Sequence, residues 1–337
     1  MTRFDPKSPT LLPLADSVVV LTGGATGIGA ATVSQLASLN AKVIFGDVAS
    51  PSDNLTSLPN VTYVKCDVTI YQDIIKLFDT ALDQHGKVDH AVSIAGVTER
   101  GGWFDSASSI EGVRTGPPEG LVMDVNARGP MWFAQIAVQY LAHGVKREDG
   151  YSNKSLTLVA SIASWLETPG IPAYQCSKHA VLGLLRALRL YLPGAFGQVE
   201  GGIRINCISP SMTDTRMVDG IREGWVEGGH PVNQPADVAR VIVGVSRAGK
   251  GSQSVWYDGK EAAGVRKKKN WGGMDWDDDE KEARGMSGRN WVVVGGEAWD
   301  MEEGLDRTMD SWLGESVSEK LKGGQEALGV GKGWTQG

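Results

Sequence analysis

Cysteine is scarce in this 337-residue chain. The three residues, Cys66, Cys176 and Cys207, lie far apart and show no CxxC spacing. An odd, scattered set of this kind argues against a disulfide framework and against a cysteine-based zinc site. We therefore expect no metal centre, and we expect the protein to work in a reducing compartment, by default the cytoplasm.

The chain also lacks an excess of basic residues, because 33 Lys and Arg stand against 40 Asp and Glu, a net charge of −7. This balance argues against nucleic acid as a partner, since phosphate binding needs basic surface. No apolar run approaches the roughly 20 residues of a membrane-spanning helix. The first 17 residues contain three prolines and no unbroken apolar stretch, so they do not resemble a signal peptide and no membrane partner is expected.

Short apolar runs alternate with longer amphipathic ones, which predicts an α/β fold with a parallel sheet covered on both faces. The expected strands are residues 17–21, 42–46, 61–65, 90–94, 155–160 and 204–208. The expected helices are residues 27–39, 71–85, 119–142 and 174–192.

After residue 217 the alternation weakens, although 235–247 still reads as an amphipathic helix with proline at its start. Residues 249–289 are rich in glycine and charge, with RKKK and DWDDDEKE blocks typical of a solvated insertion. Either 290–296 or 254–259 can supply the last strand. We prefer 290–296, which is more continuously apolar and precedes a plausible helix.

These patterns divide the chain into four parts. They are an N-terminal arm (1–14), a core (15–248) with a substrate loop (217–235), the charged insertion (249–289), and the last strand with a C-terminal extension (290–337).

A glycine-rich loop, TGGATGIG, joins the first strand to the first helix and places Gly23, Gly27 and Gly29 in G-x-x-x-G-x-G spacing. Without side chains, the backbone can approach a pyrophosphate, and the helix N-terminus supplies N–H groups and positive potential. The loop therefore predicts dinucleotide binding. The alternative is a glycine-rich turn that binds nothing.

Asp47 ends the second strand, 18 residues after Gly29. A carboxylate there can accept hydrogen bonds from both hydroxyls of a ribose, and it would repel a 2′-phosphate. Neither Thr26 nor Val48 offers a cation for such a phosphate. We therefore favour NAD over NADP. An NADPH-dependent reductase is the alternative, and Asp47 can also be read as a turn residue.

Two further strand ends fit a cofactor. Asp67 closes the third strand, where its side chain can reach an adenine amino group, although Asp67 or the following Thr69 can equally cap the next helix. The small residues of SIAG (93–96) end the fourth strand and would let a cofactor pass closely. A tight strand end without a ligand is the other interpretation.

Tyr174 stands four residues before Lys178 in a predicted helix, so the two share a face, and Ser161 precedes Tyr174 by thirteen residues. Free tyrosine titrates at about pH 10 and acts as a general base near neutrality only if its phenolate is stabilised. The ammonium of Lys178 and the positive charge of an oxidised nicotinamide would lower the pKa of Tyr174. Ser161 can hydrogen-bond a substrate carbonyl. Coincidence on an ordinary helix is the alternative.

TGGATGIG, CDVT, Asn126 in DVNARG, Ser161 and the Tyr174–Lys178 pair, in this order and spacing, resemble the short-chain dehydrogenase/reductase family over about residues 15–247. The tail WDMEEGLDRTMDSWLG is similar to C-termini of fungal members. The resemblance implies a Rossmann-type doubly wound α/β fold, a single domain with a C-terminal extension. It also implies an oxidoreductase acting on a secondary alcohol or ketone, with a place in secondary metabolite biosynthesis.

The resemblance also implies a role for each matching residue. Tyr174 would be the general acid and base, Lys178 would lower its pKa and bind the nicotinamide ribose, and Ser161 would polarise the carbonyl. Asn126 would hold a water that links Lys178 to solvent, or it is simply a polar residue inside a helix. Besides Tyr174 and Lys178, the cofactor-binding residues would be Thr22, Gly23, Gly27, Ile28, Gly29, Asp47, Asp67, Val68, Ala95, Gly96, Pro210, Thr213 and Thr215.

The chain departs from the family pattern at two strand ends. The usual Asn-Asn-Ala-Gly is Ser93-Ile94-Ala95-Gly96, which removes a side-chain contact to a central helix. The usual Pro-Gly after the sixth strand is Pro210-Ser211, which predicts a stiffer loop. The insertion has no counterpart in the family core.

Three segments beyond the strand ends, 98–118, 164–172 and 217–233, are candidates for substrate contact. Their large apolar residues are Trp103, Phe104, Trp165, Leu166 and Trp225. This content predicts an apolar, ring-containing alcohol or ketone as substrate, unless the aromatic residues only pack the loops.

Family resemblance further implies a homodimer or homotetramer paired through the helices that hold Asn126 and Tyr174. The main alternative function keeps the fold and lacks the redox role: a scaffold that binds a dinucleotide without turnover, or an enzyme that catalyses a non-redox step.

Overall fold

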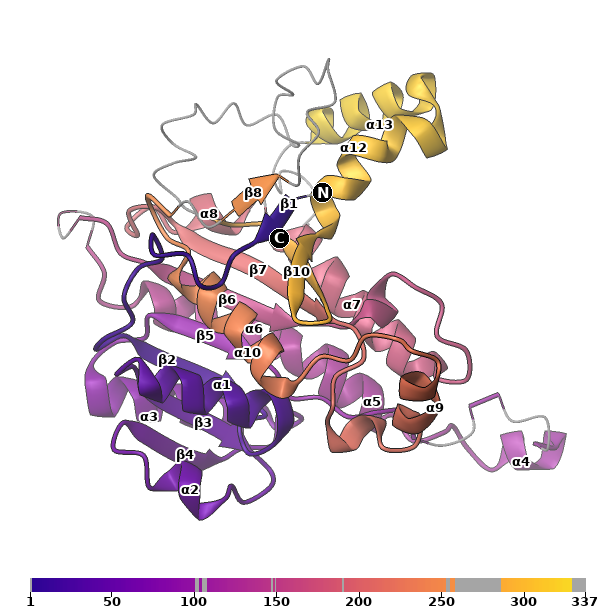
Figure 1. The fold of residues 1–337 in the computed structure, drawn as a ribbon, viewed down its shortest axis with the longest axis horizontal. Coiled ribbons are helices and arrows are strands. Elements are labelled where there is room, and N and C mark those ends of the chain that lie inside the picture. Colours follow the sequence, from indigo (N-terminus) through magenta and orange to yellow (C-terminus); the bar gives the residue numbers. More distant parts are fainter. Residues whose placement is uncertain are drawn as a thin grey trace.

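The computed structural model describes residues 2–100, 103–104, 108–146, 148, 150–189, 191–252, 255–257 and 286–328. Ten strands of these residues form one sheet in the order β4-β3-β2-β5-β6-β7-β9-β10-β1-β8 (Figure 1). From β4 to β9 all neighbours are parallel, and the strand order reverses at β2. The predicted Rossmann-type doubly wound α/β fold is thereby confirmed.

The parallel strands are β2 (Val18–Thr22), β3 (Lys42–Asp47), β4 (Val61–Lys65), β5 (His90–Ser93), β6 (Lys154–Val159), β7 (Ile203–Pro210) and β9 (Asn290–Val294). The central strands β2 and β7 are buried on both faces, as expected when helices cover both sides of a sheet, whereas the edge strand β4 is only partly buried.

Helices cover the sheet in two layers, one on each face (Figure 1). One layer holds α1 (Gly27–Ser38) and α10 (Pro235–Arg247), which pack against each other. The other holds α3 (Tyr71–His85), α6 (Gly129–Ala142) and α7 (Pro172–Leu188). Shorter elements are α2 (Asp53–Thr56), α4 (Ile110–Arg114), η3 (Ile162–Ser164), α8 (Leu192–Ala195), η4 (Arg216–Val218) and α9 (Arg222–Glu227).

The helix expected over 119–142 is not uniform. It begins as α5 (Leu121–Met123), passes through the π-helical turn η1 (Asp124–Arg128) and continues as α6. Pro130 gives the physical reason, because proline has no N–H to donate to the carbonyl of Asn126 four residues earlier. The backbone therefore forms a wider, π-helical turn at Asn126, and such turns are frequent at functional sites.

Beyond β9 the sheet continues with antiparallel strands. β10 (Glu297–Asp300) folds back on β9, β1 (Thr2–Phe4) pairs with β10, and β8 (Val255–Tyr257) lies at the edge. Val255–Tyr257, the described part of the rival segment 254–259, thus supplies an edge strand, while β9 lies beside β7. The RKKK and DWDDDEKE blocks lie outside the described residues.

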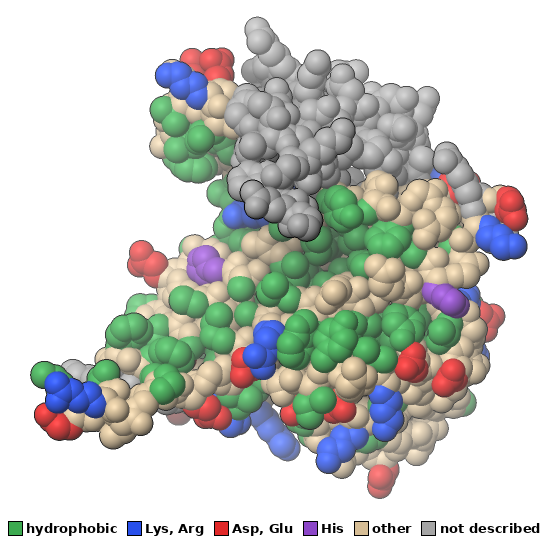
Figure 2. Space-filling model, turned by 180° about the vertical axis from the view of Figure 1, so that it is seen from behind, with side chains coloured by type: hydrophobic (Ala, Val, Ile, Leu, Met, Phe, Trp, Pro, Cys, Tyr) green, Lys and Arg blue, Asp and Glu red, His purple; other side chains and the backbone are tan. Residues whose placement is uncertain are grey.

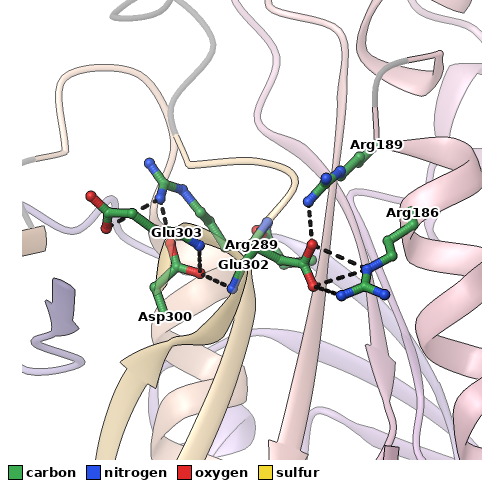
Figure 3. A network of polar contacts seen from close by, with 7 residues as sticks. Arg186, Arg189, Arg289, Asp300, Glu302 and Glu303 are labelled. Carbon is green, nitrogen blue, oxygen red and sulfur yellow. Dashed lines mark hydrogen bonds and ion pairs between the residues drawn. The ribbon is translucent and has the colours of Figure 1, made fainter. Parts of the chain in front are cut away.

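The C-terminal helices are α12 (Met301–Leu313) and α13 (Glu315–Leu328), and an ionic network fixes α12 to α7 (Figure 3). Buried Glu302 accepts hydrogen bonds from Arg186 at 3.1 Å and from Arg189 at 2.5 Å. Asp300 caps the first turn of α12 and pairs with Arg289; its burial raises the pKa of that carboxyl. The extension therefore braces the helix that carries Tyr174 and Lys178.

Among the described residues, no helix has both the length and the apolar character to cross a membrane. The same part of the chain brings together no group of three or more His, Cys, Asp or Glu side chains that could hold a metal ion.

A buried polar cluster lies at the amino ends of β5 and β6. Lys154 donates to Asp89 at 2.9 Å, and the ring Nδ1 of His90 lies 2.8 Å from the Ser155 hydroxyl. Burial, together with the nearby cations Arg204 and Lys154, lowers the pKa of His90 to about 3. Folded His90 is therefore neutral, whereas an unfolded histidine takes up a proton below about pH 6.5.

We expect the His90→Asn variant to lose part of the acid sensitivity of the fold. A histidine whose pKa is depressed in the folded state weakens stability as pH falls, by up to about 1.4 kcal/mol per pH unit below about pH 6.5. Asn keeps a polar group for Ser155 and removes the titration. Urea unfolding between about pH 7 and about pH 5 should show a shallower slope for the variant. Exposed His143→Asn is the control, and equal slopes for wild type and His90→Asn would contradict the prediction.

Candidate active site

The loop between β2 and α1 has a shape that only glycine allows at two positions. Gly23 has a φ of +74°, and a Cβ on Gly29 would lie 1.8 Å from the Gly23 carbonyl oxygen. In the described structure no side chain caps α1 at Thr26, and its first turn contains no acidic residue. Uncapped N–H groups beside a glycine cradle fit the diphosphate of a dinucleotide.

Asp47 lies against this loop. Its carboxylate accepts hydrogen bonds from the N–H groups of Ala25 and Ala49, each at 2.9 Å. Asp47 is thus a turn residue, and its oxygens still have lone pairs for ribose hydroxyls. The two interpretations of Asp47 are therefore compatible.

Asp67 also forms a turn, because its Oδ1 accepts from the backbone N–H and the hydroxyl of Thr69, at 2.9 and 2.7 Å. The alternative that Asp67 or Thr69 caps the next helix is wrong, since the N-cap residue of α3 is Ile70. Val68 is buried and packs against Gly129 at the start of α6.

The end of β5 contacts the glycine loop on one side and the helix α7 on the other. A Cβ on Gly23 would lie 2.7 Å from the Ala95 Cα, and the Ala95 N–H donates to the Thr22 hydroxyl at 3.4 Å. A Cβ on Gly96 would lie 3.6 Å from the Lys178 Nζ. The small residues at 95 and 96 thus let loop and ammonium approach the same point.

Asn126 holds the chain that follows Gly96. Its side chain is fully buried, its Oδ1 accepts from the Val97 N–H at 2.8 Å, and its Nδ2 donates to the Val97 carbonyl at 2.8 Å. A Cβ on Gly96 would lie 3.3 Å from the Asn126 Oδ1, so the amide lies near Lys178 as well. The water link between Asn126 and Lys178 stays a prediction.

Tyr174 and Lys178 come together on α7, which begins at Pro172, two residues earlier than expected. The Lys178 Nζ lies 5.6 Å from the centroid of the Tyr174 ring and donates to the Val159 carbonyl at 3.3 Å. Ser161 follows two residues later at the end of β6, and its Oγ accepts from the Ala163 N–H at 3.2 Å. The Tyr174 ring and the Lys178 ammonium are thus close together on α7. Ser161 follows two residues after Val159, whose carbonyl accepts the hydrogen bond from Lys178.

The loop after β7 closes over the glycine loop. Pro210 is the last residue of β7, and the Thr213 hydroxyl donates to the Ser211 carbonyl at 2.9 Å. The Thr215 methyl group lies 3.2 Å from where a Cβ on Gly27 would be. Ile28, half-buried, packs against the core behind the loop. Thr215 of this loop therefore lies at the uncapped start of α1.

The large apolar residues of the three substrate segments differ in exposure. Trp225 donates its Nε1–H to the Pro231 carbonyl, and Arg186 stacks on the Trp165 ring at 4.7 Å, so both pack the structure. Phe104 and Leu166 are instead 84% and 59% exposed. The arm around α4 extends from the body of the molecule (Figure 1).

Sequence reasoning did not single out Glu99 or Asn233, which lie inside two of these segments. Glu99 accepts a hydrogen bond from the Tyr174 N–H at 2.6 Å. Asn233 is fully buried and donates to the Val293 carbonyl at 2.9 Å, which ties the loop after β7 to β9. The position of Glu99, three residues after Gly96 at the predicted cofactor site, was the one sequence signal that could have identified it.

We predict that Asn126→Ala lowers the free energy of unfolding by about 2 to 4 kcal/mol, because it leaves both Val97 groups without their partners. Denaturant unfolding measures the loss. Asn54→Ala, on exposed α2, is the matched control and should change stability by less than about 0.5 kcal/mol. An equally small effect at Asn126 would show that the hydrogen bonds between the Asn126 amide and Val97 do not stabilise the chain after β5.

Known proteins resemble the chain in sequence and in fold. The family model for short chain dehydrogenases matches residues 17–225, more than half of the chain. The short-chain dehydrogenase/reductase ascJ of Acremonium egyptiacum is 33% identical over 64% of this chain and 69% of its own length. The chanoclavine-I dehydrogenase easD of Claviceps purpurea is 30% identical over 68% of this chain and 90% of its own length.

Among solved structures, 3-oxoacyl-[acyl-carrier protein] reductase from Brucella melitensis in complex with NAD overlays with a TM-score of 0.57 at 24% identity. The match covers 69% of this chain and 90% of that one. It shows the fold, and the sequence matches show the kinship: the chain belongs to the short-chain dehydrogenase/reductase family.

Proposed function

We propose that the protein is an NAD-dependent oxidoreductase that interconverts a secondary alcohol and a ketone, with Tyr174 as general acid and base. One observation carries the proposal: the buried ammonium of Lys178 lies near both the Tyr174 ring and Gly96, and Ala95, next to Gly96, contacts the glycine loop. A phenol, a buried cation and an anion-binding loop at one edge of the sheet support proton transfer next to a dinucleotide.

Each side chain has a distinct task in this proposal. The bound dinucleotide supplies or takes up a hydride. During reduction the Tyr174 hydroxyl gives its proton to the substrate oxygen, and during oxidation the phenolate takes it back. Lys178 stabilises the phenolate by its charge, and Ser161 donates a hydrogen bond to the substrate oxygen.

The preference for NAD rests on Asp47, whose carboxylate the Ala25 and Ala49 N–H groups hold at the edge of the loop. A 2′-phosphate placed there would meet this negative charge. An NADPH-dependent reductase is the alternative that the second experiment below tests.

The remaining parts of the proposal concern substrate and assembly. Exposed Phe104 and Leu166 support an apolar, ring-containing alcohol or ketone. For a homodimer or homotetramer, support comes from Met131 of α6, which is 54% exposed, and from the apolar side chains spread over the face in Figure 2. A cytoplasmic location and a place in secondary metabolite biosynthesis stay predictions.

The Tyr174→Phe variant should lose kcat/KM by about 100- to 10,000-fold, because the proton donor is gone while the ring remains. Steady-state assays with NAD and a panel of linear and cyclic secondary alcohols measure this. The dissociation constant for NADH should stay within about threefold. Tyr191→Phe, exposed beyond α7, is the control. Undiminished oxidation by Tyr174→Phe would contradict the role of Tyr174 as general acid and base. A wild type that binds NADH but oxidises none of the alcohols would favour the dinucleotide-binding scaffold or a non-redox enzyme.

Asp47→Asn should shift cofactor preference towards NADPH. The amide keeps an acceptor for one loop N–H, but it no longer repels a 2′-phosphate. Loss of one charge at contact distance predicts an NADH-to-NADPH affinity ratio reduced by about fivefold or more. Fluorescence titrations with both cofactors measure the ratio, with Asp53→Asn on neighbouring α2 as control. A wild-type protein that binds NADPH more tightly than NADH would refute the NAD assignment.

A further inference from the structure

Glu99 has one carboxylate oxygen in use and one without a partner. Its Oε2 accepts the 2.6 Å hydrogen bond from the Tyr174 N–H. Its Oε1 exposes less than 1 Å² and has no hydrogen-bond partner among the described residues. A buried carboxylate oxygen without a donor is unfavourable, because it has lost its water and gained nothing in return.

The bond to Tyr174 fixes where this oxygen lies. Tyr174 is the third residue of α7, in the first turn, where free N–H groups and the helix dipole attract a carboxylate. Glu99 also stands three residues after Gly96, beside which the Lys178 ammonium lies. The unpartnered oxygen therefore belongs to a side chain held between the Tyr174 backbone and the end of β5.

Nearby charged and polar groups do not satisfy it. The Lys178 ammonium donates a hydrogen bond to the Val159 carbonyl rather than to Glu99. Trp103, four residues after Glu99, has a buried Nε1–H that also has no partner among the described residues. Near Tyr174, the acceptor Oε1 of Glu99 and the donor Nε1–H of Trp103 thus both lack a partner among the described residues, and they do not bond to each other.

We propose that Glu99 determines substrate specificity by accepting a hydrogen bond from a second donor group of the substrate, a hydroxyl or an amine, away from the reacting carbinol. This inference rests on the proposed function and narrows its substrate class from an apolar ring to a ring that carries a second polar group. The buried Nε1–H of Trp103 offers such a substrate an additional donor. The hydrogen bond from the second substrate group gives Oε1 the partner that it lacks among the described residues.

The test compares cyclohexanol with the 1,2-, 1,3- and 1,4-cyclohexanediols and with 4-aminocyclohexanol, as substrates of the full chain with NAD. In wild type, kcat/KM for at least one of the disubstituted rings should exceed that for cyclohexanol by about tenfold or more, as a hydrogen bond to a charged group predicts. A diol preference identifies a hydroxyl as the second group, and a preference for the amino alcohol identifies an amine.

Glu99→Gln is the decisive variant. Its amide oxygen can keep the bond to the Tyr174 N–H, and its NH₂ group then replaces Oε1 with a donor. In this variant the ratio of kcat/KM for the disubstituted ring to kcat/KM for cyclohexanol should fall to about 1, while kcat/KM for cyclohexanol itself changes by less than about threefold. Glu111→Gln, exposed on α4 in the same segment, should keep the wild-type preference.

Two outcomes overturn the inference: a wild type that oxidises cyclohexanol and all the disubstituted rings equally well, or a preference that survives in Glu99→Gln. A lower kcat/KM for cyclohexanol in Glu99→Gln, with the preference unchanged, would make Glu99 only a positioning residue for α7. Failure of the proposed function looks different, because wild type would then oxidise none of these alcohols and none of the linear ones.

Discussion

The site depends on one pair of hydrogen bonds, in which the buried Asn126 amide binds both the N–H and the C=O of Val97. These bonds hold the chain that leaves β5 at a fixed distance from α7. Gly96 can then lie beside the Lys178 ammonium, and Ala95 can touch the glycine loop. Without these two hydrogen bonds, residues 95 and 96 would not be held between the glycine loop and α7, the helix that carries Tyr174.

The helix that carries Asn126 is shaped for these two hydrogen bonds. Pro130 leaves the Asn126 carbonyl without its usual donor, and the chain adopts a π-helical turn there. On the other side, Glu302 holds α7 through Arg186 and Arg189 (Figure 3). Removing one partner of such a buried ion pair leaves an uncompensated charge, so the extension and α7 are coupled. The C-terminal extension therefore supports the site without lying in it.

Much of the fold could be predicted because parallel strands buried on both faces are continuous apolar runs. The buried strand predicted over 17–21 lies one residue before the observed Val18–Thr22, and the strand predicted over 61–65 has the bounds of the partly buried edge strand β4. The glycine loop was predictable for a similar reason, since a close backbone approach requires glycine at positions such as 29.

What could not be predicted depends on partners distant in the sequence. The three residues of β1 form a strand only because β10 and β8 lie on either side of them. The contact of Glu99 with Tyr174 joins residues 75 positions apart, and Val68 packs against Gly129 of α6. The π-helical turn had a local signal in Pro130, which helical periodicity alone does not reveal.

A crystal structure of the protein with oxidised dinucleotide tests the central claim most directly. The account predicts the diphosphate at the uncapped start of α1, the Tyr174 hydroxyl facing the nicotinamide C4 atom, and the Lys178 Nζ about 3 Å from a hydroxyl of the nicotinamide ribose. A nicotinamide bound away from Tyr174, or a Lys178 ammonium turned into bulk water, would contradict it.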